Sequence, residues 1–204
     1  VELGVLRLLH PMVLQQAAEA CINFDGLNLS LLEISHRSKN FVSVMDEARA
    51  IIKELFEVGD EYEVLYLGGG ASLQFAMVPY NLLRENGLAA YVNTGSWAGK
   101  AIKEAKLIGN TKVIASSEDK KFTYIPKGFD IPSEADYLHL TSNNTIYGTQ
   151  IKNFPDSPVP VVCDMSSDIF SRKVDAKKFT LIYAGAQKNM GPAGSTMVMV
   201  KKDA

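Results

Sequence analysis

The fold of this chain is constrained most by a series of short, largely apolar runs that alternate with stretches of helical character. The runs lie at residues 63–67, 88–92, 111–115, 137–140, 160–163, 180–185 and 196–200. Apolar runs of this length are typical of strands that are buried on both faces, as in parallel sheets. Mixed with helices, they predict an α/β layer structure with a mostly parallel sheet covered on both faces.

Helical periodicity is strongest after Ser38, which is placed to act as an N-cap. Apolar side chains form one stripe along this helix, with charged side chains opposite, and we expect the stripe to face the protein core. The stripe consists of Phe41, Val44, Met45, Ala48, Ile51, Ile52 and Leu55. Further helices are expected at residues 11–24, 71–83 and 97–109, the first because it follows a proline start.

Composition limits the class of protein. A length of 204 residues with a formal net charge of -2 fits one sizeable domain and gives no electrostatic footprint for nucleic acid or an anionic membrane. Cys21 and Cys163 lie far apart, and neither cysteines nor histidines show metal-ligand spacing. No apolar run is long enough to span a bilayer, so we expect a soluble, cytoplasmic protein. Because the sequence stops just after a strand, we also expect it to be part of a longer polypeptide.

Residues that could bind a ligand or take part in catalysis follow the ends of several predicted strands. Ligands bind at these strand ends in open α/β sheets. They are the glycine-rich loop Gly68–Ser72, the turn Thr94–Trp97, the polar segment Asn143–Thr145, Asp164 and Lys188. Each has an ordinary interpretation when it is taken alone. Glycines form turns, a tryptophan packs in the core, an aspartate caps a turn, and a lysine extends its head to water.

Together, these residues match the requirements of pyridoxal 5'-phosphate. A glycine loop that leads into a helix N-terminus favours a phosphate group, and an aromatic ring can stack on a flat ligand. A lysine amine forms Schiff bases with carbonyl groups, and an acid beside the ring nitrogen completes the set. The combination therefore predicts a pyridoxal-phosphate site more strongly than any one of its parts.

At residues 184–194, AGAQKNMGPAG, the sequence closely resembles the lysine segment of phosphoserine aminotransferases, which are class-V, fold-type I pyridoxal-phosphate enzymes. Supporting segments occur in family order from about Gly26 onward. They are LLEISHRSKNF, VLYLGGGASLQFAMVPYNLL, NTGSWAGKAIKEAK, NNTIYGTQI and CDMSSDIFSRKVD. The resemblance implies the large domain of a three-layer α/β/α transferase at residues 26–204, incomplete at its C-terminal end and lacking the small C-terminal domain. Residues 1–25 would form an N-terminal segment and helix.

The resemblance also implies a role for each site residue. Lys188 would be catalytic, forming the internal aldimine with the cofactor and moving the proton between Cα and C4'. The other cofactor-binding residues would be Ala71, Ser72 and Gln187 at the phosphate, Trp97 against the ring, Thr145 at the phenolic oxygen and Asp164 at the ring nitrogen. His36 and Arg37 would bind the substrate, and no metal is implied.

The implied reaction is reversible transfer of an amino group from L-glutamate to 3-phosphohydroxypyruvate. It gives O-phospho-L-serine and 2-oxoglutarate, a step of serine biosynthesis, and the family works as a homodimer with shared active sites. Two alternatives stay open. The chain could be another fold-type I pyridoxal-phosphate enzyme, or a non-catalytic fragment that needs a companion chain.

Overall fold

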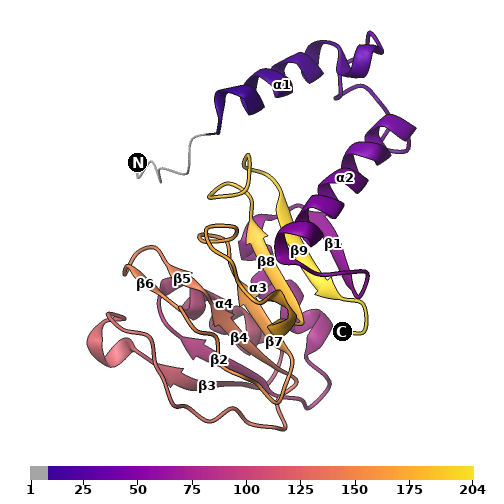
Figure 1. The fold of residues 1–204 in the computed structure, drawn as a ribbon. Coiled ribbons are helices and arrows are strands. Elements are labelled where there is room, and N and C mark those ends of the chain that lie inside the picture. The colour runs from indigo at the N-terminus through magenta and orange to yellow at the C-terminus, as the bar shows by residue number, and fades with distance from the viewer. Residues whose placement is uncertain (1–8) are drawn as a thin grey trace. The chain divides into compact units, whose positions relative to one another are not determined.

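The computed structural model describes residues 9–204 and divides into two compact units (Figure 1). The first unit ends at Glu57 and the second comprises Val58–Ala204. Residues 1–8 lie outside the described part, and with them the start of the N-terminal segment predicted at residues 1–25. The predicted domain boundary near residue 26 stays a prediction.

The first unit is helical. It contains α1 (Pro11–Ile22), the short 3₁₀ helix η1 (Phe24–Gly26) and α2 (Lys39–Phe56). Helix α2 begins as predicted, because the Ser38 side chain accepts a hydrogen bond from the Phe41 backbone N–H at 3.3 Å.

The apolar stripe of α2 forms the predicted core face only in part. Ile52 is 5% exposed, whereas other members of the stripe are open to solvent. Val44, Ile51 and Leu55 are 44%, 46% and 55% exposed. The physical reason lies in the small size of the unit, whose other α-helix, α1, contains no buried residue. Helical periodicity therefore predicted the helix correctly, but it predicted only in part which of its side chains are buried.

The second unit is built on a seven-stranded sheet with the order β1-β9-β8-β7-β4-β2-β3. Its strands are β1 (Tyr62–Leu67), β2 (Ala89–Asn93), β3 (Thr111–Ser116), β4 (Tyr137–Thr141), β7 (Val161–Asp164), β8 (Leu181–Gly185) and β9 (Thr196–Lys201). The neighbours from β8 to β3 pair in parallel, whereas β9 is antiparallel to both β1 and β8. The predicted α/β class and mostly parallel sheet are confirmed.

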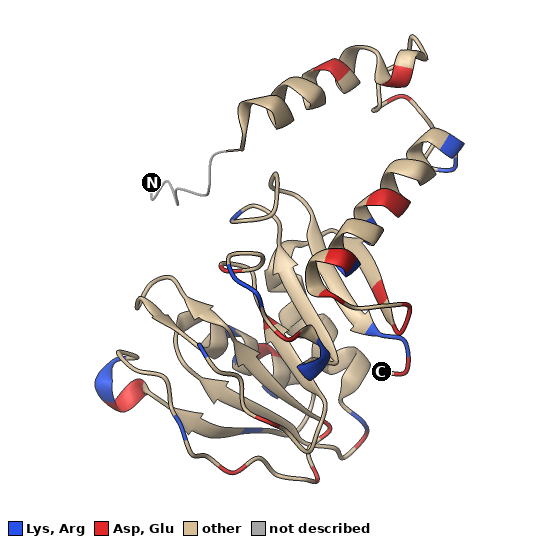
Figure 2. Cartoon of the chain, in the orientation of Figure 1, with Lys and Arg blue, Asp and Glu red and all other residues tan. Residues whose placement is uncertain are grey.

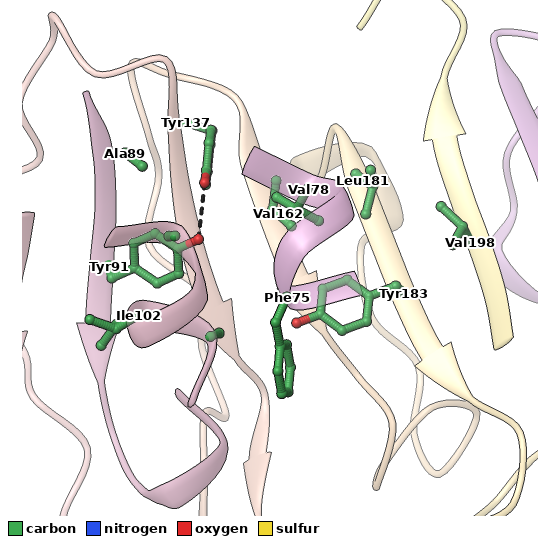
Figure 3. Packing of buried hydrophobic residues seen from close by; sticks show 12 residues of the cluster. Phe75, Val78, Ala89, Tyr91, Ile102, Tyr137, Val162, Leu181, Tyr183 and Val198 are labelled. Carbon is green, nitrogen blue, oxygen red and sulfur yellow. Dashed lines mark hydrogen bonds between the residues drawn. The ribbon is translucent and has the colours of Figure 1, made fainter. Parts of the chain in front are cut away.

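Two α-helices pack on one face of this sheet, α3 (Gly70–Leu82) and α4 (Ser96–Ile108). Figure 3 shows Phe75 and Val78 of α3 and Ile102 of α4 against side chains that alternate along the strands, among them Val162 and Tyr183. Burial of these apolar groups stabilises the unit by about 25 cal/mol per Å² removed from water. The core thus fixes the strand ends from which the site is built.

Polar groups inside this core form two hydrogen-bonded pairs that are joined by ring stacking. The hydroxyls of Tyr91 and Tyr137 lie 2.9 Å apart, and His139 stacks on Tyr91 with ring centroids 4.7 Å apart. His139 Nε2 lies 2.9 Å from the Tyr183 hydroxyl. Burial lowers the pKa of His139 to about 3, so its ring stays neutral at ordinary pH.

The remaining segments of the second unit are short. A small hairpin of β5 (Asn143–Asn144) and β6 (Thr149–Gln150) follows β4, and sequence periodicity gave no sign of it. Two 3₁₀ helices, η2 (Glu118–Lys120) and η3 (Ala176–Lys178), lie in the connections. Figure 2 shows acidic and basic residues spread along the described ribbon rather than gathered in one stripe of a single sign. Within the described residues, no helix is both long and apolar enough to cross a membrane.

Candidate cofactor site

The candidate site lies at one edge of the sheet. The parallel strands β2, β4, β7 and β8 all end there, and the antiparallel strand β9 begins there. The sequence predicted chemically capable residues after each of these strand ends. The topology therefore brings the loops that carry Trp97, Thr145, Asp164 and Lys188 to the same edge, where ligands bind in sheets of this type.

Asp164 is the last residue of β7 and is buried, with 6% of its surface exposed. Its Oδ1 accepts hydrogen bonds from the Ser166 backbone N–H at 2.9 Å and from Ser166 Oγ at 2.6 Å. Ser166 Oγ in turn accepts from the Gly185 N–H at 3.1 Å, so the carboxylate is fixed relative to β8. Within residues 9–204, no hydrogen bond is found for Asp164 Oδ2.

The protonation of Asp164 is set by opposing effects. Burial raises the pKa of its carboxyl group above the ordinary value, while the hydrogen bonds from Ser166 and the positive charge of Lys188 lower it. Burial is the largest of these effects. A cationic N–H group placed at Oδ2 would favour the ionised form further, because an opposite charge stabilises a buried carboxylate.

Lys188 and Trp97 lie close together at this edge of the sheet. Lys188 lies in the turn after β8 and is half-buried, and its Nζ is 5.3 Å from the centroid of the Trp97 ring. Trp97 lies in the first turn of α4 and also has the Nζ of Lys100 4.3 Å from its ring centroid. The structure therefore brings the Lys188 amine close to the aromatic ring of Trp97, the two groups that the sequence predicted for the cofactor site.

The glycine-rich loop forms an open helix N-terminus. Gly69 is the N-cap of α3 with φ +84, and an added Cβ would lie 2.4 Å from Leu73 Cδ2, so only glycine fits without a shift. No side chain caps this helix among the described residues. The first-turn residues Ala71 and Ser72 thus present backbone N–H groups and an exposed hydroxyl, a combination that favours an anion.

Gln187 and Thr145 occupy different environments. Gln187 folds back over the end of β8, where its Oε1 would lie 2.7 Å from a Cβ added at Gly185. Thr145 is exposed at the turn of the β5–β6 hairpin, and the described residues give it no side-chain hydrogen bond. The roles predicted for both residues stay predictions.

His36 and Arg37 lie in the first unit. They are exposed in the turn that precedes α2, where the Arg37 backbone N–H donates to Ser35 Oγ at 3.1 Å. Their predicted contacts with the substrate stay predictions, because the two units are each described by themselves.

The sequence placed Thr94 and Asn144 at strand ends but did not predict the contacts that support the site, and it missed Asp168. Ser166 holds Asp164, and Asn144 Oδ1 accepts a hydrogen bond from Thr94 Oγ1 at 3.2 Å. Asp168 is buried with 8% of its surface exposed, and it binds side chains on both sides of the hairpin. The spacing of Ser166 two residues after Asp164 is a recognisable local-turn signal, whereas the contacts of Asp168 join distant segments and leave no such signal.

The residues present fit pyridoxal 5'-phosphate. Oδ2 of Asp164 is available to a ring N–H, Trp97 offers a ring face, Lys188 offers an amine, and the N-terminus of α3 suits a phosphate group. The site therefore combines one carboxylate, one amine and one anion-binding helix N-terminus at a single edge of the sheet. It suits binding and proton transfer on a flat, phosphorylated aldehyde.

Comparisons with known proteins agree with this geometry. The family model described as aminotransferase class-V matches residues 8–204. A phosphoserine aminotransferase of Flavobacterium johnsoniae is 60% identical over 197 residues, which cover 96% of this chain and 55% of the relative. The chain spans about half the length of the curated relatives it matches.

Solved structures give the same result. A phosphoserine aminotransferase from Bacillus circulans subsp. alkalophilus has a TM-score of 0.93 and 49% identity, covering 96% of this chain and 55% of that one. A pyridoxal-phosphate-bound phosphoserine aminotransferase from Trichomonas vaginalis has a TM-score of 0.88 and 31% identity, covering 96% and 56%.

Proposed function

Because the chain belongs to the class-V aminotransferase family, we propose that it is a portion of a phosphoserine aminotransferase. The complete enzyme would transfer an amino group from L-glutamate to 3-phosphohydroxypyruvate, giving O-phospho-L-serine and 2-oxoglutarate in cytoplasmic serine biosynthesis. The observation that carries the proposal is the meeting of Asp164, Trp97 and Lys188 at one sheet edge.

Cofactor binding is assigned to the second unit. Pyridoxal 5'-phosphate, when bound, supplies an electron sink for the carbanion that forms when a proton leaves the substrate. Asp164 holds negative charge at the ring nitrogen, and Ser166 keeps that carboxylate oriented. Trp97 excludes water from one face of the ring. Ser72, Gln187 and the backbone of Ala71 bind the phosphate, and Thr145 binds the phenolic oxygen.

Proton transfer is assigned to Lys188. Its Nζ lies 5.3 Å from the centroid of the Trp97 ring, and we propose that it takes a proton from the substrate carbon and returns it on the cofactor side. Restricted access of water to this half-buried turn limits loss of the proton to solvent. The turn after β8 therefore carries both the covalent attachment point and the general base.

Substrate recognition is assigned to the first unit and to parts of the enzyme beyond this chain. Arg37 offers a planar fork that suits a carboxylate, and His36 offers a partner for the substrate phosphate or side-chain carboxylate. Both side chains are exposed here, so their role depends on a partner surface. We propose that this surface comes from the rest of the polypeptide and from a second subunit of a homodimer.

The decisive experiment is covalent capture of the cofactor. The purified chain is mixed with pyridoxal 5'-phosphate, reduced with borohydride, digested and analysed by mass spectrometry. We expect the pyridoxyl group on the peptide that contains Lys188, and none on that peptide in Lys188→Ala. Modification spread over surface lysines, such as Lys120 and Lys121, would contradict the assignment.

Two further measurements separate the alternatives. A different fold-type I enzyme would prefer an unphosphorylated keto acid over 3-phosphohydroxypyruvate in an amino-acceptor assay. A fragment that needs a companion chain would capture the cofactor at Lys188 without turnover, and it would gain activity when the C-terminal portion of a relative is added. Turnover by the chain alone would show that it does not need a companion chain for activity.

A further inference from the structure

We propose that the hairpin Asn143–Gln150 is a clamp that sets the separation between Trp97 and Asp164, and that Asp168 is the positioning residue that anchors it. The inference rests on the proposed function, because this separation defines the slot for a flat cofactor ring. In the sheet, β4 lies between β7, which ends in Asp164, and β2, which leads to Trp97. The hairpin continues β4 and so lies between the two loops.

One carboxylate binds both ends of the hairpin. Asp168 Oδ1 accepts a hydrogen bond from Oγ of Ser142, the residue before β5. Asp168 Oδ2 accepts from Nε2 of Gln150, the last residue of β6, at 2.9 Å. Because the Asp168 side chain is buried, its bond to Ser142 is shielded from competing water and its bond to Gln150 is partly shielded.

The negative charge of Asp168 is balanced by Arg172. Arg172 Nη2 is 3.9 Å from Asp168 Oδ2 and donates to the Ile151 carbonyl oxygen at 2.6 Å, while Nη1 donates to the Lys152 carbonyl oxygen at 3.3 Å. The guanidinium also lies 5.4 Å from the centroid of the Phe154 ring. A buried carboxylate with a charged partner and two donors is a fixed anchor rather than a solvated charge.

The same side of the hairpin is tied to the loop that begins with Asp164. The Ser142 backbone N–H donates to the Asp164 carbonyl oxygen at 3.0 Å. Asn143 Nδ2 donates to Ser167 Oγ at 2.8 Å, and that hydroxyl donates to the Asn143 carbonyl oxygen at 3.0 Å. The backbone of Asp164, at the end of β7, is therefore hydrogen-bonded to the base of the hairpin.

The opposite side of the hairpin contacts the turn that leads to Trp97. Asn144 Oδ1 accepts from Thr94 Oγ1, and the hydroxyls of Tyr147 and Ser96 lie 3.0 Å apart. The approach is close, since a Cβ added at Gly95 would lie 2.9 Å from Tyr147 Cδ2. Displacement of the hairpin would therefore shift the first turn of α4, where Trp97 lies.

The test uses Trp97 as its own reporter, because the chain contains a single tryptophan. Acrylamide quenching of its fluorescence in the cofactor-free protein measures how accessible the ring is. Quenching by added pyridoxal 5'-phosphate gives the dissociation constant. The variants are Asp168→Ala, the conservative Asp168→Asn, and the matched control Asp203→Asn, which removes an exposed carboxylate at the other end of the sheet.

We expect Asp168→Ala to increase acrylamide quenching of Trp97 and to weaken pyridoxal-phosphate binding about tenfold. Asp168→Asn, which can still hydrogen-bond Ser142 and Gln150, should restore binding to within about threefold of the parent chain. Asp203→Asn should match the parent chain in both measurements. A decrease in thermal stability alone would not support the clamp.

An Asp168→Ala protein with an unchanged far-UV spectrum, unchanged acrylamide quenching and unchanged cofactor affinity would overturn the clamp. If that variant does not fold, Tyr147→Phe, which removes only the hydroxyl that contacts Ser96, takes its place under the same criteria. If the parent chain binds no pyridoxal 5'-phosphate, the proposed function fails while acrylamide quenching still decides the clamp. Failure of the clamp alone leaves cofactor binding by the parent chain intact.

Discussion

The two units of this chain differ in how they hold their candidate functional residues. In the second unit, Asp164 is buried and hydrogen-bonded, and Lys188 and Trp97 lie against each other at the end of a packed sheet. In the first unit, Arg37 is exposed in a turn before a helix whose apolar stripe is partly exposed. The proposed cofactor half of the site is thus specified by contacts inside one unit, whereas the proposed substrate half lacks such support within the described residues.

The largest expected effect separates the two units directly. Asp164→Ala should weaken pyridoxal-phosphate binding about a hundredfold, because it removes the buried charge proposed to pair with the ring nitrogen. Arg37→Ala should change the dissociation constant by less than about twofold, since an exposed arginine makes little contribution to cofactor binding. Equilibrium dialysis measures both, and Asp164→Asn separates the effect of charge from that of the Ser166 hydrogen bonds. Equal effects of Asp164→Ala and Arg37→Ala on the dissociation constant would show that cofactor binding does not depend more on the second unit than on the first.

The second prediction concerns stability and pH in the second unit. The pKa of His139 is lowered by burial to about 3, so the native protein keeps it neutral while the unfolded chain binds a proton below about pH 6.5. Stability is therefore lost as pH falls from about 6.5 toward 3, by about 1.4 kcal/mol per pH unit from this group. Asp164, whose pKa is raised by burial, acts in the opposite direction, because the native state retains its proton longer than the unfolded chain.

The contribution of His139 is isolated by a difference between proteins. His139→Phe combined with Tyr183→Phe removes the titrating ring and its hydroxyl partner together, while Asp164 stays in place. Urea unfolding at pH 6 and pH 4.5 should show a fall in stability that is about 2 kcal/mol smaller in the double variant than in the parent chain. Parallel pH curves for the two proteins would show that His139 becomes protonated in the folded state.

The sequence predicted the sheet well because its strands have apolar side chains on both faces. Runs such as TLIYAG are unambiguous, and Ser38 and Gly69 lie at helix starts where their residue types predict them. The positions of Asp164 and Lys188 at strand ends followed from the same pattern, since parallel strands end at one sheet edge. Each of these features depends on local sequence.

Features that depend on contacts between distant segments were not predictable. The contacts of Asp168 with Ser142 and Gln150 join the segment after β7 to both ends of the β5–β6 hairpin, and this short hairpin has no periodic pattern. The exposure of Leu55 could not be read from the stripe of α2 either, because periodicity shows which residues share a face and not what covers it.

The third prediction tests how tightly the site edge is packed. Gly95→Ala should destabilise the second unit by about 1–2 kcal/mol, because its Cβ would contact the Tyr147 ring and Asn144 Oδ1 at 2.9 and 3.1 Å. Gly194→Ala is the matched control, since its φ of +107 is also positive and an added Cβ there meets no atom within 4 Å. Urea unfolding of the two variants measures the difference. Equal stability would show that the hairpin yields easily, and that the second unit is less rigid at this edge than its contacts indicate.

The smallest effect is expected on the apolar stripe of the first unit. Leu55→Ser should change the free energy of unfolding by less than about 0.5 kcal/mol, because the side chain is already more than half exposed. Leu140→Ser in the sheet, where the side chain is 1% exposed, should cost about 3 kcal/mol or more. If Leu55→Ser instead destabilised the chain by more than about 1 kcal/mol, the stripe would be covered by another surface in solution. The contrast between the units would then reflect assembly rather than the packing of each unit, and analytical ultracentrifugation of parent and variant would identify a second copy as that surface.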